Sequence, residues 1–278
     1  MDARPSRGSL PPLRASFPFE PGHSTGNTRP ARAAGVNRLV CGLQPVREAI
    51  RAHGSKLERV LVEANGRAVS PQLEAVARFA GDHRVRVERV ARAELDRIAR
   101  GVRHQGAVAF APELAILSLD DLPVEGGALL VALDEVQDPQ NFGAVIRSAV
   151  SMGATGIVWP EHRSAPLSPA TFRASAGAVE YARLCRVASL PTALVSLRAR
   201  GVVAVGLDMT ADTRLDHTDL VGPIALVGGS EGKGLRKTVK HACDALASLP
   251  MPGRIDSLNA SAAVAIALYE AVRQRHTK

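Results

Sequence analysis

Short apolar runs alternate with amphipathic segments along the C-terminal half of the chain. We expect buried strands at Leu129–Leu133, Gly156–Trp159, Leu184–Val187, Val202–Gly206, Ile224–Val227 and Ala245–Leu249. Helices are expected between them, at Phe142–Met152, Pro169–Gly177, Thr192–Arg200, Leu235–Cys243 and Asn259–Arg273. Regular alternation of strands and helices predicts a parallel sheet covered by helices, which is an α/β fold.

A smaller α/β unit is expected at residues 38–111. The predicted strands are Arg59–Val62, Val85–Val87 and Ala107–Phe110, and the predicted helices are Pro45–His53, a helix with Ser70 as N-cap and Pro71 at its first position, and Glu94–Arg100. Residues 112–127 carry Pro, Gly and Asp and predict a linker to a second domain at 128–278. Residues 1–37 hold few large aliphatic side chains, so we expect a disordered, mildly basic arm there.

Composition narrows the classes of protein to consider. Apolar residues make up 46% of the 278 residues, which is enough for real cores. No apolar run reaches the roughly 18 residues of a membrane span, and the N-terminus shows no apolar signal region, so we expect a cytoplasmic protein. Three cysteines lie far apart without metal-ligand spacing, which indicates buried small side chains rather than a metal site.

The chain carries a net charge of +8, and nearly all of its basic residues are arginines. A planar guanidinium binds phosphate oxygens with two parallel hydrogen bonds. This charge favours a nucleic-acid partner, although many basic proteins bind none.

Three segments rich in small and polar residues follow predicted strands. They are 138–147 (Asp-Pro-Gln-Asn-Phe-Gly-Ala-Val-Ile-Arg), 228–236 (Gly-Gly-Ser-Glu-Gly-Lys-Gly-Leu-Arg) and 250–261 (Pro-Met-Pro-Gly-Arg-Ile-Asp-Ser-Leu-Asn-Ala-Ser). Ligands of open α/β sheets bind at the carboxyl ends of strands, so the three segments are expected to converge on one site. The second segment does not match a Walker A loop in spacing or in its final residue, which disfavours a nucleotide hydrolase.

Several of these residues have an ordinary structural explanation as well as a chemical one. If Phe142 begins a helix, Asn141 is its N-cap, and Arg147 is a cation within an otherwise apolar helix. Asn259 is expected both to cap the last helix and to contribute to a site. An arginine among apolar positions favours contact with a phosphate or a ribose.

Together the three segments resemble the SpoU/TrmH branch of the SPOUT RNA methyltransferases, over roughly Leu129 to Arg275. The stretches 41–49 (Cys-Gly-Leu-Gln-Pro-Val-Arg-Glu-Ala) and 101–109 (Gly-Val-Arg-His-Gln-Gly-Ala-Val-Ala) resemble the L30e-like substrate-binding domain that precedes many of these catalytic domains. The resemblance implies a deep trefoil knot in the C-terminal domain, a homodimer formed through that domain, and S-adenosyl-L-methionine as methyl donor.

The resemblance also implies roles for individual residues. The implied catalytic residues are Asn141, Arg147, Glu231, Ser257 and Asn259. The implied donor-binding residues are Gly229, Leu249, Met251, Gly253 and Leu258. No metal is required. The base that deprotonates the ribose hydroxyl stays open between the Glu231 carboxylate, a substrate phosphate held by Arg147, and Arg147 itself. The last is costly because a guanidinium is not readily deprotonated.

The expected reaction is 2′-O-methylation of a ribose in structured RNA. The two-domain layout most resembles the enzymes that modify a guanosine of 23S rRNA. A tRNA guanosine enzyme, an antibiotic-resistance rRNA adenosine enzyme, and a non-catalytic RNA-binding protein of the same fold are the alternatives.

Overall fold

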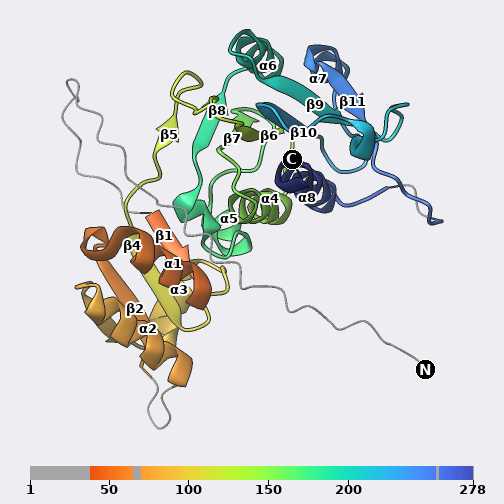
Figure 1. Cartoon of the computed structure of the whole chain (residues 1–278). Coiled ribbons are helices and arrows are strands. Elements are labelled where there is room, and N and C mark those ends of the chain that lie inside the picture. Colours follow the sequence, from red (N-terminus) through yellow and green to blue (C-terminus); the bar gives the residue numbers. More distant parts are fainter. Residues whose placement is uncertain (1–37, 65–69, 255–256, 278) are drawn as a thin grey trace, which may run out of the picture. The chain divides into compact units, whose positions relative to one another are not determined.

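The computed structural model describes residues 38–64, 70–254 and 257–277. The predicted arm at 1–37 lies outside the described residues, as do two positions of the third polar segment, 255 and 256. The described residues form a four-stranded sheet and a seven-stranded sheet (Figure 1).

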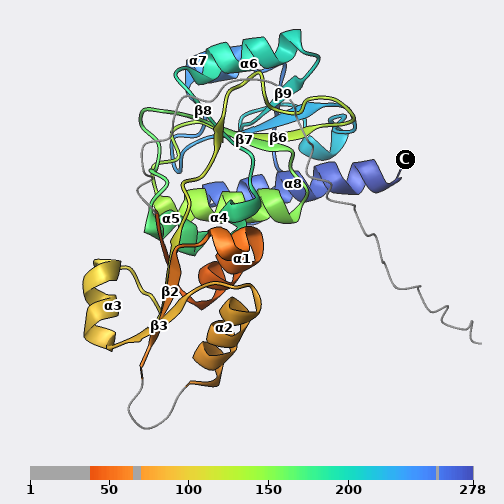
Figure 2. The ribbon, with the colours of Figure 1, turned by 90° about the vertical axis from the view of Figure 1, so that its left-hand side faces the viewer.

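The four-stranded sheet has the order β1-β4-β2-β3. Its strands are β1 (Arg38–Cys41), β2 (Arg59–Glu63), β3 (Val87–Val90) and β4 (Ala107–Ala111), and its helices are α1 (Leu43–His53), α2 (Pro71–Asp82) and α3 (Arg92–Ala99). Strand β4 is antiparallel to β1 and β2, whereas β2 and β3 are parallel. Helices α1 and α2 share one core with the sheet and α3 packs in a second core, so both faces of the sheet are covered (Figure 2).

The seven-stranded sheet has the order β11-β9-β10-β6-β7-β8-β5, and every neighbouring pair is parallel. Its strands are β5 (Ile116–Leu117), β6 (Leu129–Leu133), β7 (Gly156–Pro160), β8 (Leu184–Val187), β9 (Val203–Leu207), β10 (Ile224–Gly228) and β11 (Ala245–Ala247). The predicted α/β architecture with a helix-covered parallel sheet is therefore confirmed.

Helices cover both faces of this sheet. They are α4 (Pro139–Ser151), α5 (Pro169–Ala174), α6 (Leu190–Ala199), α7 (Lys237–Ala242) and α8 (Ala260–Thr277), and short 3-10 helices occur at Gly54–Lys56, Ala178–Tyr181 and Leu215–His217. Leu129, Val131 and Leu133 of β6 join the core under α4, α5 and α8, whereas Leu130 and Ala132 join the core under α6 and α7. Alternate residues thus serve opposite cores, which is why the whole strand is apolar.

Helix α4 begins earlier than the sequence pattern indicated. Its first residue is Pro139, and Asp138 is the N-cap, whose carboxylate accepts hydrogen bonds from the backbone N–H groups of Gln140 (3.2 Å) and Asn141 (3.1 Å). Proline suits the first helical position because it has no N–H to leave unpaired. The expectation that Asn141 caps a helix beginning at Phe142 is therefore wrong, and Asn141 lies inside the first turn.

Other boundaries differ for reasons of long-range pairing. Strand β3 begins at Val87 rather than Val85 and pairs with β2 as far as Val90. Strand β5 lies within the predicted linker, where Ile116 and Leu117 pair with β8. Ser70 precedes α2 as predicted, but its side chain caps no backbone N–H.

The cysteines are structural in character. Cys41 and Cys185 are buried and Cys243 is half-buried. Burial raises the pKa of the Cys41 and Cys185 thiols to about 11 and that of Cys243 to about 12, which keeps all three protonated and unreactive at neutral pH. No group of His, Cys, Asp and Glu side chains within the described ranges is arranged to hold a metal ion.

No described helix combines the length and the apolar composition that crossing a bilayer requires.

Candidate functional site

The three polar segments meet at one edge of the seven-stranded sheet. The first follows β6, the second follows β10, and the third lies between β11 and α8. Strands β9, β10 and β6 are parallel neighbours, so their carboxyl ends open on the same edge. A cavity of about 430 Å³ lies there, lined by residues of the second and third segments and by residues that follow β9; we call it the motif cavity.

Three predicted catalytic side chains form one hydrogen-bonded series, which we call the Asn141 relay. Asn141 Nδ2 donates to Glu231 Oε2 at 3.1 Å, and Asn259 Nδ2 donates to Asn141 Oδ1 at 2.8 Å. Asn259 Oδ1 in turn accepts from the backbone N–H of Ser261 at 2.9 Å, so Asn259 both caps α8 and holds Asn141. These contacts fix the direction of the Asn141 amide.

Burial differs along the Asn141 relay. Asn141 is only 8% exposed, whereas Glu231 is exposed to solvent. A buried amide with both ends bonded is rigid, and a carboxylate held by it keeps a defined position while remaining accessible to a ligand. Glu231 itself does not line the motif cavity, but its chain neighbours Ser230 and Gly232 do, so the arrangement holds one carboxylate in a loop that forms part of the cavity wall.

Close helix packing holds Asn141 in place. Gly143 lies next to α5, and a Cβ built on it would approach the Ala174 Cβ to 2.5 Å and the Thr171 carbonyl oxygen to 2.6 Å. Only glycine permits this approach of α4 to α5. The first turn of α4 is thus positioned by packing as well as by its Asp138 cap.

The Gly-rich segment folds back on itself after β10. Ser230 and Gly234 exchange backbone hydrogen bonds of 3.2 and 3.0 Å, so residues 230–234 form a closed loop that carries Glu231. A Cβ built on Gly229 would lie 2.2 Å from the carbonyl carbon of Gly234 and 2.5 Å from the backbone nitrogen of Leu235. Glycine is required at 229 because the loop's own backbone occupies that space.

Four of the five predicted donor-binding residues line the motif cavity. They are Gly229, Leu249, Met251 and Leu258, and the predicted catalytic residue Ser257 lines it as well. Gly253 is not among the lining residues and is exposed, with no described atom within 4 Å of the position of a Cβ built on it. The apolar part of the wall comes from the stretch after β11 together with Leu207 and Met209 at the end of β9 and Val264 of α8.

Sequence reasoning missed a charged pair that lines the motif cavity. Asp208 follows β9 and forms an ion pair with Lys240 of α7, and both residues line the cavity. Burial opposes ionisation of Asp208, but hydrogen bonds from Lys240 and Thr210 outweigh it and lower the pKa of this carboxyl. The signal that would have found Asp208 is its place at the carboxyl end of a predicted strand.

Arg147 stands apart from the Asn141 relay within one chain. It lies on α4 and is exposed, and its side chain forms no hydrogen bond or ion pair with another described residue. Six residues along an α-helix turn the direction by roughly 600°, so Arg147 and Asn141 point to different sides of α4. Its guanidinium is free to bind an external anion.

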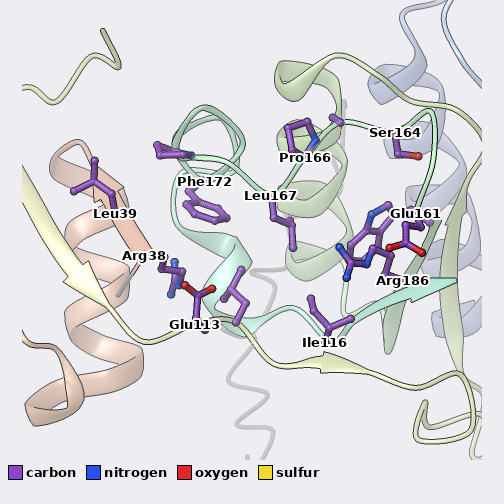
Figure 3. Close-up of a pocket in the computed structure, with 14 residues that line it drawn as sticks. Arg38, Leu39, Glu113, Ile116, Glu161, Ser164, Pro166, Leu167, Phe172 and Arg186 are labelled. Atoms are coloured by element: carbon purple, nitrogen blue, oxygen red, sulfur yellow. The ribbon is translucent and has the colours of Figure 1, made fainter. Parts of the chain in front are cut away.

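A larger cavity, of about 640 Å³, lies at the carboxyl end of β7 (Figure 3). Trp159, Phe172 and Arg186 contribute to its wall. It contains none of the residues that the three polar segments supply. Of the site residues predicted from sequence, Gly229, Leu249, Met251, Ser257 and Leu258 line the motif cavity, and none lines this larger one.

Both parts of the chain match known protein families. Residues 128–269 match the SpoU rRNA Methylase family, and residues 39–116 match the family described as RNA 2'-O ribose methyltransferase substrate binding. An "Uncharacterized tRNA/rRNA methyltransferase" of Mycobacterium leprae (strain TN) is 38% identical over 275 residues, covering 97% of this chain and 88% of the relative.

Two solved structures resemble most of the chain. The SpoU methyltransferase AviRb from Streptomyces viridochromogenes, crystallised with the cofactor AdoMet, is 30% identical with a TM-score of 0.70, covering 86% of this chain and 91% of that one. The AdoMet-bound rRNA methyltransferase from Sinorhizobium meliloti is 29% identical with a TM-score of 0.69, covering 85% and 87%.

Proposed function

Because this chain belongs to the SpoU rRNA Methylase family, we propose that it transfers the methyl group of S-adenosylmethionine to a ribose 2′-oxygen of structured RNA. The observation that carries the proposal is the Asn141 relay, which binds the Glu231 carboxylate of a loop whose residues Ser230 and Gly232 line the motif cavity. In its most specific form, the substrate is a guanosine of 23S rRNA and the protein acts in the cytoplasm.

The motif cavity suits the methyl donor. Leu249, Met251 and Leu258 offer apolar surface to an adenine ring, and the carboxylate of Asp208 and the hydroxyl of Thr210 offer hydrogen-bond partners to polar groups of the ligand. When bound, S-adenosylmethionine supplies an electrophilic methyl group on a sulfonium centre. No metal ion is needed for this chemistry.

The chain's own residues must orient the ribose and remove its proton. In the reaction the 2′-oxygen forms a bond to the methyl carbon as the carbon–sulfur bond breaks, and the hydroxyl proton goes to a base. Glu231, held by Asn141 at 3.1 Å, is one acceptor for that proton. The other is a substrate phosphate bound by the free guanidinium of Arg147, which would also stabilise the developing alkoxide.

Recognition of RNA is assigned to the N-terminal sheet and its helices. Arg97, Arg100 and Arg103 are exposed on α3 and the loop that follows it, and none forms an ion pair with a described residue. Unpaired guanidinium groups on a small domain are suited to binding phosphates of a folded RNA. Residues 38–111 are accordingly proposed to select the substrate, and residues 128–278 to bind the donor.

We also propose a homodimer formed through the C-terminal domain. Ile266 and Tyr269 of α8 are 45% and 59% exposed although they are large and apolar. Exposed apolar side chains on one helix favour contact with a second copy.

The experiment that tests the function is a map of 2′-O-methylation in rRNA and tRNA from cells with and without the gene. Loss of one rRNA methyl group, restored by the wild-type gene but not by Glu231→Gln, is expected. Loss from a tRNA alone would move the assignment to the tRNA alternative, and an unchanged map would contradict the proposal.

A further inference from the structure

We propose that the ion pair between Asp134 and Arg236 positions the Gly-rich loop, so that Glu231 and the donor-binding backbone are held in one arrangement. This inference rests on the proposed function, because it concerns the same cavity. Both residues lie outside the sets predicted from sequence. They are positioning residues, since they act through the loop between them.

Both carboxylate oxygens of Asp134 are bound by Arg236, and we call this contact the anchor. Asp134 follows β6 directly, and its side chain is fully buried. One carboxylate oxygen accepts from the backbone N–H of Arg236 at 2.8 Å, and the other accepts from Arg236 Nε at 2.8 Å and lies 2.7 Å from its terminal nitrogen. The hydrogen bond to Asp134 raises the pKa of the Arg236 guanidinium, so Arg236 stays charged in this contact.

This anchor closes both ends of the loop on the strand that leads to Asn141. At the first end, the backbone N–H of Asp134 donates to the Gly228 carbonyl oxygen at 2.8 Å. At the second end, Arg236 is bound by the Asp134 side chain as described. Asp134, the residue directly after β6, therefore binds the residues on both sides of Gly229–Leu235.

The loop needs such an anchor because glycine gives it little stiffness. Gly232 and Gly234 have φ values of +76° and +63°, and no described atom lies within 4 Å of a Cβ built on either. Ordering such residues is entropically unfavourable, and apart from Leu235 the loop buries little side-chain surface. A buried, doubly bonded ion pair gives a single geometry that a hydrophobic contact would not specify.

A second carboxylate extends the anchor toward solvent. Glu135 Oε1 lies 3.2 Å from Arg236 Nη1 and 3.2 Å from Arg163 Nη1. Because the outer part of this network is exposed, its contribution is screened by salt, and the buried Asp134 contact carries the positioning.

The test measures donor affinity and the single-turnover methylation rate in a double-mutant cycle of Asp134 and Arg236. Arg236→Gln leaves the Asp134 carboxylate buried without its cation, so we expect the calorimetric Kd for S-adenosylmethionine to rise at least tenfold and single-turnover methylation to fall further. The double variant Asp134→Asn with Arg236→Gln removes the uncompensated charge and keeps an acceptor for the backbone N–H of residue 236, so it is expected to recover part of the loss while its Kd stays above the wild-type value. A wild-type Kd in the double variant would show that the charged pair is dispensable and would overturn the proposal.

The matched control is Arg214→Gln, which breaks a bidentate Arg–Asp pair with Asp216 on the exposed surface of the same domain. It is expected to leave Kd and turnover unchanged. A wild-type Kd in Arg236→Gln, or an equal loss in Arg214→Gln, would overturn the proposal. Since Kd is measured without RNA, a wild-type protein that binds donor but methylates no RNA would refute the proposed function and not this inference.

Discussion

Replacing Gly229 by alanine is the most direct way to disturb the motif cavity. The new Cβ would lie 2.2 Å from the Gly234 carbonyl carbon and 2.4 Å from its oxygen, whereas ordinary contact begins at 3.4 Å. Both neighbours are backbone atoms, so no side-chain rotation relieves the collision. The loop that carries Glu231 must open.

The expected magnitude follows from the bonds that opening breaks. Ser230 and Gly234 exchange two backbone hydrogen bonds, of 3.2 and 3.0 Å. At roughly 1 kcal/mol each, their loss amounts to about 2 kcal/mol. If the closed loop is required to bind the donor, this corresponds to about a 30-fold rise in Kd.

Calorimetric titration with S-adenosylmethionine measures this change, and circular dichroism checks that the domain stays folded. The matched control is Gly222→Ala, because no described atom lies within 4 Å of a Cβ built there and its φ is not positive. The control should bind like wild type. A Kd for Gly229→Ala within threefold of wild type would refute the reasoning that loop closure shapes the cavity.

Further predictions concern catalysis, pH dependence and assembly. Arg147→Lys should lower single-turnover methylation nearly as much as Arg147→Ala, by about 100- to 1000-fold, because a point charge does not replace a bidentate fork; unchanged donor Kd is expected, and near-normal turnover in Arg147→Ala would exclude the role. Glu231→Gln should reduce turnover without changing donor Kd, and normal turnover would leave a substrate phosphate as the base. Burial opposes ionisation of Asp208, but hydrogen bonds from Lys240 and Thr210 lower its pKa below the ordinary value of 3.8. The pairing therefore stabilises the folded state at pH values above 3.8, and this stabilisation is lost as the pH falls from 3.8 through the lowered pKa. Melting temperatures should show a smaller acid-induced loss for Asp208→Asn than for wild type, and equal losses would contradict the sign. Tyr269→Glu should convert a dimer into a monomer by light scattering at micromolar concentration, and a monomeric wild type would disprove the α8 interface.

Much of the C-terminal fold was determined by the sequence itself. Strands β6 and β8 have the predicted bounds, β7 and β10 each extend one residue further, and β9 is shifted by one residue at both ends. Their apolar runs are unambiguous because both faces of each strand are buried, so local composition reports the environment directly. The three polar segments also follow the ends of strands β6, β10 and β11, as the sequence predicted.

Local boundaries were less well determined where two residues of similar chemistry compete. Asp138 and Asn141 are both good N-cap residues, and only one can cap α4. Proline at 139 favours the earlier start, because it fits the first helical position. Strand β5 has only two residues, so it is defined by its pairing with β8 and not by its own composition.

The tertiary structure alone decided how the site is connected. Asn141 and Glu231 are 90 residues apart and Asn141 and Asn259 are 118 apart, yet each pair shares a hydrogen bond. It also brought together Asp134 with Arg236 and Asp208 with Lys240, which no local pattern links. Local sequence governs which segments become strands and helices, but the meeting of side chains depends on strand order, and strand order arises from pairings between distant parts of the chain.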